Sequence, residues 1–380
     1  MNCLIVGGGM ANKGAQAMTL VAMDILKKKY PDDQIIILAT NNTEEFLDAK
    51  LNCRAQIATY KMLKKLSRQF RKTNRTESSE LSTIFSMARV LVDISGYALS
   101  SNWSDGIVNR YIEVLNCARL FSIPVYLLPQ SFGPINYTFP KSIYMNNRIK
   151  KALEYAHKIY AREKEGYEEL TKKFGLTNVV LAKDMVLCAN SIDIKNLFDG
   201  KINRCYFSIG ENAVGIVPNS RLLTVCDEKQ LMKIYVGIIN YLQDNKNNIY
   251  IVCHSSEDKR LAKGIVMACK AQNLHIIDND MYCFDYEELF QQFNYIIASR
   301  YHSIIHALKK GTPCIAIGWA DKYTEVLHDF QQDDYIVDMR NNISLEEILV
   351  KIISLQNKYS LERKIILEKI KSIVNPDYLI

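Results

Sequence analysis

The sequence predicts an α/β protein with two Rossmann-like domains, each built on a parallel sheet, and a central cleft between them. The 380 residues exceed what one ordinary hydrophobic core fills, so two domains are the default expectation. Short β-branched runs alternate with longer amphipathic segments along the whole chain, which is typical of parallel sheets covered by helices on both faces. A polar, turn-rich break at Asp199–Asn203 divides the pattern in two. We therefore expect one domain over residues 1–200, a second over 204–355 and a C-terminal helix over 356–380.

The first half contains apolar runs of strand length, several of them separated by helical patterns. The predicted strands are Cys3–Val6, Gln34–Leu38, Val90–Ile94, Val125–Leu128, Lys158–Ala161 and Val179–Ala182. The predicted helices are Ala15–Lys29, Asp105–Phe121, Lys141–Ala156 and Lys164–Phe174. Ligands of open parallel sheets bind at the carboxyl ends of the strands, so the strand-to-helix junctions are the places to look for function.

The second half repeats the alternation and predicts a second parallel sheet. Its predicted strands are Val214–Val217, Ile249–Val252, His275–Ile277, Tyr295–Ala298, Cys314–Ile317 and Tyr335–Val337. Its predicted helices are Glu228–Gln243, Asp258–Ala271, Tyr286–Phe293, Ser303–Lys310, Lys322–Phe330 and a long amphipathic one at about Leu345–Ile373.

Composition and charge argue against several classes of function. The net charge of +7 is a mild excess that favours acidic ligands, and no zinc-finger spacing, RNP-like motif or basic heptad helix indicates nucleic-acid binding. The ten cysteines include no Cys-x-x-Cys pair, which predicts reduced thiols and no structural zinc site. The apolar start at Cys3–Val6 is too short for a signal peptide, and no apolar run approaches the ~20 residues that cross a bilayer. We expect a cytoplasmic protein.

The strongest functional signal is the junction at Tyr295–His302. An apolar run ends abruptly in Ser299-Arg300-Tyr301-His302, and a helical pattern follows. The positive end of a helix favours an anion, Arg300 offers a fork for phosphate or carboxylate, and His302 can move a proton near neutral pH. His306 lies one turn further on, and we expect it to pack in the interior because no Glu follows His302 as in a metalloprotease.

The N-terminal junction is a glycine loop, Gly7 to Gly14. Glycines such as Gly9 let the backbone approach a ligand, although the spacing is neither the dinucleotide pattern nor a P-loop. A tight turn without a ligand is the alternative. The polar residues Asn12 and Lys13 favour a polar ligand.

Two more junctions of the first half carry polar side chains. Asp93, followed by Ser95 and Gly96, could act as a base or accept hydrogen bonds from sugar hydroxyls, or it could cap the loop that follows. Gln130, in Pro129–Pro134, could line the cleft or belong to a structural loop. Neither reading is preferred from the residues alone.

Arg162 and Glu163 end another predicted strand. A cation at a helix start is disfavoured by the helix dipole unless an anion lies beside it, which favours ligand binding by Arg162 over a simple ion pair with Glu163. In the second half, His254 and Lys322 also follow predicted strands.

The segment Lys61–Arg75 contains seven basic residues and no acidic one. Its apolar residues have helical spacing. A solvated basic helix or a mobile loop is the favoured interpretation, and the alternative is a peripheral contact with an anionic membrane or a lipid-linked pyrophosphate.

Taken in order, these motifs resemble the polysaccharide pyruvyl transferase family. The resemblance covers most of the chain and is carried by the strand-end motifs Asn12-Lys13-Gly14, Asp93-Ile94-Ser95-Gly96, Pro129-Gln130-Ser131-Phe132-Gly133-Pro134, Ala161-Arg162-Glu163, Ser299-Arg300-Tyr301-His302, Gly311-Thr312-Pro313 and the later Lys322. One departure is Lys183-Asp184-Met185, where related chains often have Asp-Pro. That departure leaves any role of Asp184 open.

The resemblance implies a fold similar to the GT-B glycosyltransferases, with an acceptor side and part of the donor site in the first domain and the donor site in the second. It implies transfer of pyruvate from phosphoenolpyruvate to a sugar as a cyclic ketal, without a cofactor or metal. The acceptor would be lipid-linked, nucleotide-linked or polymeric. The implied donor-binding residues are Arg162, Arg300, Tyr301, His302 and Lys322. The implied acceptor-binding residues are Gly9, Asn12, Lys13, Gly14, Asp93, Ser95, Gly96, Gln130 and His254.

Catalysis would then rest on His302 as general acid, with Glu163 as the alternative acid and Arg300 as the charge clamp. Two other readings stay open. One is a GT-B-type glycosyltransferase that uses a nucleotide sugar, in which Arg300 and Lys322 would hold the pyrophosphate and Glu287 or Glu288 the ribose. The other is a sugar- or nucleotide-binding regulator without turnover.

Overall fold

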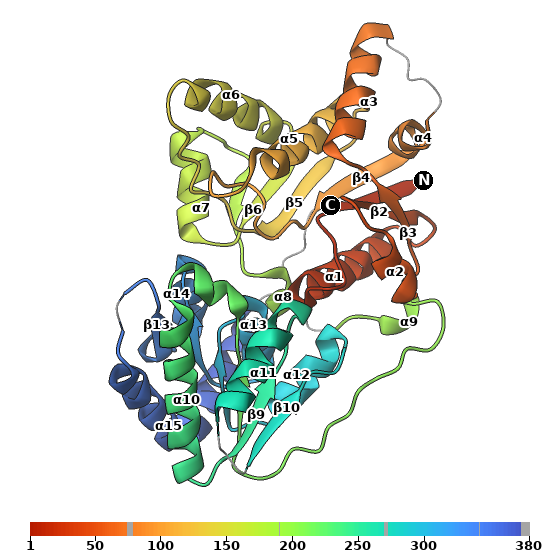
Figure 1. Ribbon diagram of the computed structural model, residues 1–380. Helices are drawn as coiled ribbons and strands as arrows, with labels where there is room; N and C mark the ends of the chain where they lie inside the picture. Colours follow the sequence, from red (N-terminus) through yellow and green to blue (C-terminus); the bar gives the residue numbers. More distant parts are fainter. Residues whose placement is uncertain (74–78, 190, 270–272, 342, 374–380) are drawn as a thin grey trace. The chain divides into compact units, whose positions relative to one another are not determined.

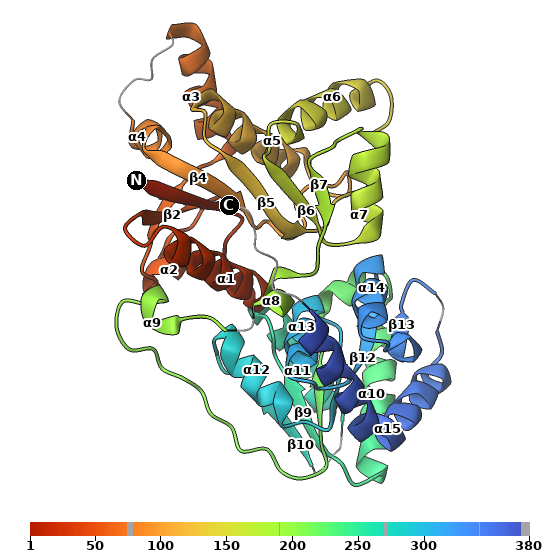
Figure 2. The ribbon, with the colours of Figure 1, turned by 180° about the vertical axis from the view of Figure 1, so that it is seen from behind.

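The computed structural model describes residues 1–73, 79–189, 191–269, 273–341 and 343–373 (Figures 1 and 2). The described residues divide into two compact units, the first formed by Met1–Met10 and Ala15–Ile202, the second by Ala11–Gly14 and residues 203–373. Each unit has its own parallel sheet, which confirms the predicted fold class of two parallel-sheet α/β domains. Within the described ranges, no helix has the length and apolar character that crossing a bilayer requires.

The first unit contains a seven-stranded parallel sheet in the order β3-β2-β1-β4-β5-β6-β7. Its strands are β1 (Asn2–Val6), β2 (Gln34–Ala39), β3 (Arg54–Ile57), β4 (Ala88–Asp93), β5 (Val125–Gln130), β6 (Lys158–Ala161) and β7 (Val179–Leu181). Its helical elements are α1 (Lys13–Lys29), α2 (Glu44–Asp48), α3 (Tyr60–Thr73), α4 (Glu80–Ser86), α5 (Asp105–Leu120), α6 (Lys141–Leu153), α7 (Lys164–Glu168), the π-helical turn η1 (Glu169–Lys173), α8 (Met185–Cys188) and α9 (Ile194–Leu197).

The order of the strands places the switch point of this sheet between β1 and β4. The two strands pair in parallel and end level, with Val6 opposite Asp93. A buried cluster of aliphatic and aromatic side chains joins one face of the sheet to α3, α4, α5 and α6, while α1 lies on the other face (Figure 1). Burial on both faces explains why β1 reads as an unbroken apolar run.

The second unit contains a six-stranded parallel sheet in the order β10-β9-β8-β11-β12-β13. Its strands are β8 (Ala213–Val217), β9 (Asn248–Val252), β10 (Leu274–Ile277), β11 (Tyr295–Ala298), β12 (Cys314–Gly318) and β13 (Ile336–Asp338). Its helical elements are η2 (Ser220–Thr224), α10 (Glu228–Asp244), η3 (Ser256–Asp258), α11 (Lys259–Ala268), α12 (Cys283–Gln291), α13 (Tyr301–Lys309), α14 (Asp321–Asp329), η4 (Asp333–Tyr335) and α15 (Leu345–Ser372).

The switch point of the second sheet lies between β8 and β11. These strands pair with Val217 opposite Ala298, so both end at the same level. The loops that follow β8, β9 and β11 therefore meet at one edge of the sheet, which is where an open parallel sheet binds its ligands.

The strands predicted from the sequence are all present, with bounds that differ by two residues at most. The sequence pattern missed β3, because this four-residue edge strand is only half-buried along its length and lacks an apolar run. The helix predicted to end at Ala271 ends at Ala268, and residues 270–272 lie outside the described ranges. The division predicted between residues 355 and 356 falls inside α15.

Candidate functional site

The end of β11 in the second unit is held rigidly by hydrogen bonds. The backbone N–H of Ser299 donates to Val217, and its carbonyl accepts hydrogen bonds from the Asn219 side chain at 2.8 Å and from the Tyr323 hydroxyl at 3.0 Å. Arg300 is the N-cap of α13. The switch point therefore presents Arg300 and His302 from a fixed backbone at the positive end of a helix.

Asp258 organises this edge, and the sequence prediction did not include it. It is fully buried, and its carboxylate accepts hydrogen bonds from Nε and Nη2 of Arg300, both at 2.7 Å. It also accepts hydrogen bonds from the backbone N–H and the hydroxyl of Ser220, which ties the loop after β8 to the loop after β9. Asp258 lies six residues beyond the end of β9, so the rule that selected His254, a polar residue close behind the strand, did not select it.

Arg300 has a second carboxylate partner. Its Nη2 lies 2.5 Å from Oε1 of Glu257, and although burial opposes ionisation, the hydrogen bond and charge of Arg300 lower the pKa of Glu257. The same two carboxylates outweigh the burial of Arg300 and raise the pKa of its guanidinium, which keeps it charged. These hydrogen bonds use Nε and Nη2 and leave Nη1 outside them.

The N-terminal loop contributes to the same unit. The side chain of Asn12 accepts a hydrogen bond from the backbone of Gly14, and Nζ of Lys13 lies 2.6 Å from Asp280. A Cβ atom on Gly14 would stand only 2.2 Å from Nδ1 of His302. The loop is therefore in direct backbone contact with the imidazole, which explains the glycine at this position.

His254 and His306 lie near His302, in the interior of the second unit. The rings of His254 and His306 are 5.4 Å apart, and both side chains are buried. Burial, followed by the electrostatic influence of His306, His302, Arg300 and Lys13, lowers the pKa of His254 well below its usual range, so this imidazole is neutral. Among the described residues, Nε2 of His254 has no hydrogen-bond partner.

Glu287 anchors His306 from the other side. Its carboxylate lies 2.9 Å from Nζ of Lys309 and 3.4 Å from Nδ1 of His306. Burial raises its pKa, but His306 and Lys309 outweigh burial and bring the pKa to about 2. His306 is thus an interior residue, as its position in the sequence predicted.

Lys322 makes cation–π contacts with Tyr301, the first residue of α13, and with Tyr323. The ammonium of Lys322 lies 5.1 Å from the centre of the Tyr301 ring and 5.7 Å from that of Tyr323. Tyr301 in turn meets the His302 ring edge-on at 5.3 Å. Tyr301 thus contacts both the ammonium of Lys322 and the ring of His302, the candidate proton donor.

In the first unit, Arg162 and Glu163 belong to one buried network. Nε of Arg162 donates to Glu163 at 2.8 Å, Nη1 to Asp184 at 2.8 Å and Nη2 to the hydroxyl of Ser131 at 2.6 Å. The Ser131 hydroxyl also donates to Glu163. Asp184, which the sequence left without a role, is therefore a direct partner of Arg162 at the start of α8.

Asp93 and Gln130 form a second buried network in the first unit. The Asp93 carboxylate accepts hydrogen bonds from the Ser95 backbone at 2.9 Å and from Nε2 of Gln130 at 3.1 Å. The Tyr111 hydroxyl donates to Oε1 of Gln130 at 3.4 Å. Burial raises the pKa of Asp93 despite these hydrogen bonds, so the carboxyl group lies in an environment that disfavours its charge.

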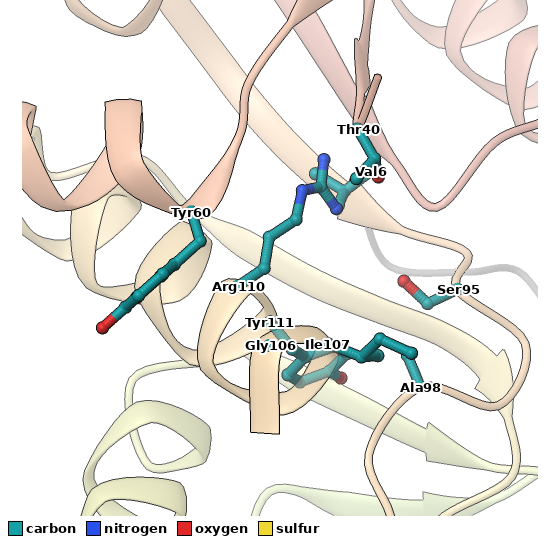
Figure 3. Close-up of a pocket in the computed structure, with 9 residues that line it drawn as sticks. All are labelled: Val6, Thr40, Tyr60, Ser95, Ala98, Gly106, Ile107, Arg110 and Tyr111. Carbon is teal, nitrogen blue, oxygen red and sulfur yellow. The ribbon is translucent and has the colours of Figure 1, made fainter. Parts of the chain in front are cut away.

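A pocket of about 190 Å³ lies next to this second network, at the switch point of the first sheet (Figure 3). Its lining residues come from the ends of β1 and β2, the starts of α3 and α5, and the loop after β4, and are Val6, Thr40, Tyr60, Ser95, Ala98, Gly106, Ile107, Arg110 and Tyr111. Arg110 is anchored by hydrogen bonds to the carbonyls of Ala58 and Leu38. Ser95 was expected here because it follows a strand, whereas Arg110 was not, because it lies inside a helix pattern and not at a strand end.

The structure thus distributes the residues predicted for the site over the two units. The second unit holds Asn12, Lys13, Gly14, His254, Arg300, Tyr301, His302 and Lys322, and the first unit holds Gly9, Asp93, Ser95, Gly96, Gln130, Arg162 and Glu163. In the part of the chain that the structure describes, no three His, Cys, Asp or Glu side chains are grouped so that they could hold a metal ion.

The fold is shared with UDP-GlcNAc 2-epimerases and with a glycosyltransferase. The UDP-GlcNAc 2-epimerase of Methanocaldococcus jannaschii is 14% identical and superposes with a TM-score of 0.58 over 93% of this chain and 92% of its own. The UDP-GlcNAc 2-epimerase of Neisseria meningitidis, bound to UDP-GlcNAc, is 12% identical with a TM-score of 0.59 over 99% and 95%. A glycosyltransferase of Rickettsia africae is 11% identical with a TM-score of 0.56 over 98% and 94%. At these identities the likeness concerns the fold alone, and it confirms the GT-B-like architecture.

The sequence comparison is more specific. A search of the curated proteins finds no match. Residues 12–321, in contrast, match the family described as polysaccharide pyruvyl transferase, and this range includes the glycine-loop residues Asn12 to Gly14 and the Arg300–His302 motif. The chain therefore belongs to the polysaccharide pyruvyl transferase family and is a transferase.

Proposed function

We propose that this enzyme transfers the pyruvyl group of phosphoenolpyruvate to a sugar of a polysaccharide or cell-surface glycan precursor. The observation that carries the proposal is the group of cationic and imidazole side chains in the second unit, at the level switch point of β8 and β11. Lys13, His254, Arg300 and His302 interact there at the positive end of α13. A small ligand with a phosphate and a carboxylate matches such a group.

In this proposal, the donor lies at the start of α13. Nη1 of Arg300 and the ammonium of Lys322 bind its anionic groups, with Tyr301 beside them. Asp258 and Glu257 fix the guanidinium in one orientation, which is the preorganisation that electrostatic catalysis requires. Arg162, also predicted to bind the donor, lies in the first unit, where Ser131, Glu163 and Asp184 hold its guanidinium in place.

The proposed chemistry needs one proton donor and two acceptor hydroxyls. His302 gives a proton to the methylene carbon of phosphoenolpyruvate, and the first hydroxyl oxygen of the sugar bonds to the central carbon. The second hydroxyl oxygen bonds to the same carbon as its bond to the phosphate oxygen breaks. The product is a cyclic pyruvate ketal. One of the two hydroxyl protons replaces the proton that His302 gave to the methylene carbon, and the other leaves on the phosphate. Glu163 is the alternative acid.

The sugar acceptor is assigned to the pocket of the first unit. Ser95 and Tyr111 line this pocket, and behind them Gln130 and Asp93 supply a buried hydrogen-bond network that can hold hydroxyls. Gly9 and Gly96 flank the same switch point, whereas Asn12, Lys13 and Gly14, which were also predicted to bind the acceptor, lie in the second unit. The proposal includes a cytoplasmic location and a peripheral membrane contact through the basic segment Lys61–Arg75, of which residues 74–78 lie outside the described ranges.

The rival function, glycosyl transfer from a nucleotide sugar, is less well supported by the second unit. The carboxylates that would hold a ribose are engaged elsewhere. Glu287 is buried against Lys309 and His306, and Glu288 pairs with Arg204 at 2.8 Å.

Ligand-induced thermal stabilisation tests the proposal. Phosphoenolpyruvate is expected to raise the melting temperature of the native chain, because a ligand that binds only the folded state stabilises it. The shift should largely disappear in Arg300→Lys, which keeps the charge but loses the guanidinium fork. The matched control is Arg340→Lys, because the exposed Arg340 is also bound by an aspartate through two nitrogens, in this case Asp338 at the end of β13. A shift with UDP and none with phosphoenolpyruvate would overturn the proposal in favour of glycosyl transfer.

A further inference from the structure

Five large apolar side chains are exposed around the starts of α5 and α6 in the first unit. Their exposed fractions are 36% for Trp103, 45% for Ile107, 79% for Phe139, 67% for Ile143 and 62% for Tyr144. We call these five residues the apolar rim. Single exposed apolar residues are ordinary, but Phe139, Ile143 and Tyr144 lie within six consecutive residues, and such a concentration marks an interaction surface.

Direct contacts join the two parts of the apolar rim. Nζ of Lys141, at the start of α6, lies 2.7 Å from Oδ1 of Asp105 at the start of α5. The backbone N–H of Ser101 donates to the carbonyl of Pro134 at 2.8 Å, which connects the loops that precede the two helices. Ile107 also lines the pocket assigned to the acceptor, so the apolar rim is continuous with the pocket.

Basic side chains flank the apolar rim. α3 carries six Lys and Arg residues and no acidic residue, and α6 carries four and none. α5 lies between these helices on the same face of the sheet (Figure 1). It packs against α3 through Cys117 and the Leu63 carbonyl, and against α6 through Asn109 and Arg148.

We propose that the apolar rim, with the basic faces of α3 and α6, docks this enzyme on an anionic lipid bilayer. Exposed aromatic and aliphatic side chains enter the headgroup boundary, and basic side chains such as Lys61, Lys65 and Arg68 are attracted to anionic headgroups. The pocket then opens at the bilayer surface, and its acceptor sugar is carried on a lipid. The docking deepens the peripheral contact proposed above by adding the apolar rim and α6, and only the last step rests on the proposed pyruvyl transfer.

Charge decides between a bilayer and a second copy of the chain as the partner. A symmetric dimer through the apolar rim would bring the same surface of both copies together, and α3 and α6 would oppose their own positive charge. An anionic bilayer is complementary to both the charge and the apolar side chains.

Vesicle flotation of the full chain tests the docking. Binding is expected to vesicles of phosphatidylcholine with phosphatidylglycerol, to weaken with added salt, and to be at least about tenfold weaker to phosphatidylcholine alone. The triple variant Phe139→Ser, Ile143→Ser, Tyr144→Ser should lose binding. Replacing Lys61, Lys65 and Arg68 by Gln should weaken it roughly 100-fold, because each basic residue contributes about a factor of five.

The matched control is a triple variant of exposed apolar residues in the second unit, Met267→Ser, Val350→Ser and Leu361→Ser, which should bind vesicles like the native chain. Equal binding of the control and the Phe139 triple variant would overturn the proposal. The proposal would also be overturned if the native chain is a dimer that does not bind anionic vesicles and the Phe139 triple variant is a monomer.

An activity assay separates this inference from the proposed function. With a soluble sugar acceptor, the Phe139 triple variant should release phosphate from phosphoenolpyruvate as the native chain does. With an acceptor anchored in anionic vesicles, the variant should no longer release phosphate. Loss with both acceptors would overturn the docking role. Vesicle binding without any phosphate release from the native chain would leave the docking in place and overturn only the pyruvyl transfer.

Discussion

Asp258 is the residue on which the binding edge of the second unit depends most directly. It joins Arg300 of the loop after β11 to Ser220 of the loop after β8. Asp258→Ala would leave the buried guanidinium of Arg300 with one fewer carboxylate partner. It would also remove the acceptor of the hydrogen bonds from the backbone N–H and the hydroxyl of Ser220. We expect a loss of about 3–5 kcal/mol in the free energy of unfolding, measured by urea titration.

Asp338→Ala is the control for that prediction. It removes an aspartate from Arg340, whose side chain is largely solvent-exposed, so its cost should stay within about 1 kcal/mol. Equal losses in the two variants would show that Arg300 does not depend on Asp258.

Glu287 makes the free energy of unfolding depend on pH. Its pKa falls from 4.5 to about 2 in the folded chain, so the unfolded chain binds more protons in this range. Its stabilising contribution is therefore complete above about pH 4.5 and is lost as the pH falls towards 2. From the shift in pKa, the contribution is on the order of 3 kcal/mol at neutral pH.

Glu287→Gln tests this dependence. The difference in free energy of unfolding from the native chain should be large at pH 6 and shrink as the pH is lowered below 4.5. Glu288→Gln is the neighbouring control, since its carboxylate pairs with Arg204 at the surface and should cost no more than about 1 kcal/mol. A difference for Glu287→Gln that stays constant with pH would contradict the prediction.

At the scale of elements, the contact between the start of α1 and the start of α13 is decisive. Gly14 leaves room for the His302 ring, and a methyl group there would stand 2.2 Å from it. We expect Gly14→Ala to displace the imidazole and lower the turnover number by about 10²-fold or more, because catalytic groups tolerate little misplacement. Steady-state kinetics of phosphate release from phosphoenolpyruvate measure this.

Gly264, in the middle of α11, provides the contrast. A Cβ atom there has open space around it, so Gly264→Ala should leave turnover unchanged and stabilise the chain by about 0.5–1 kcal/mol through helix propensity. Unchanged turnover in Gly14→Ala would show that His302 does not need its present position.

At the scale of the molecule, each unit contains one of the two tryptophans. Trp103 reports on the first unit and Trp319 on the second. In Trp103→Phe, phosphoenolpyruvate should raise the urea midpoint followed by Trp319 fluorescence, because the proposed donor contacts lie chiefly in the second unit. In Trp319→Phe, the midpoint followed by Trp103 should rise less. No rise at Trp319, or equal rises at the two tryptophans, would contradict a donor site in the second unit at Arg300.

Much of the molecule followed from sequence patterns alone. Continuous apolar runs of strand length predicted the strands of both sheets, because parallel strands buried on both faces leave little room for polar residues. The motif Ser299–His302 predicted an anion site at a strand end, because the carboxyl ends of parallel strands and the starts of helices favour anions. The sequence missed β3, since an edge strand that is only half-buried needs no apolar run.

Only the tertiary structure decided which side chains meet. Asp258 is separated from Arg300 by 42 residues and Asp184 from Arg162 by 22, and no local pattern links either pair. Arg110 and Tyr60 lie on helices, so their place in the pocket depends on how α3 and α5 pack against the sheet. The sequence by itself determined the layers of the fold and the residue types at its strand ends, because these depend on local periodicity and burial. The partners of those residues depend on long-range packing, which local periodicity does not record.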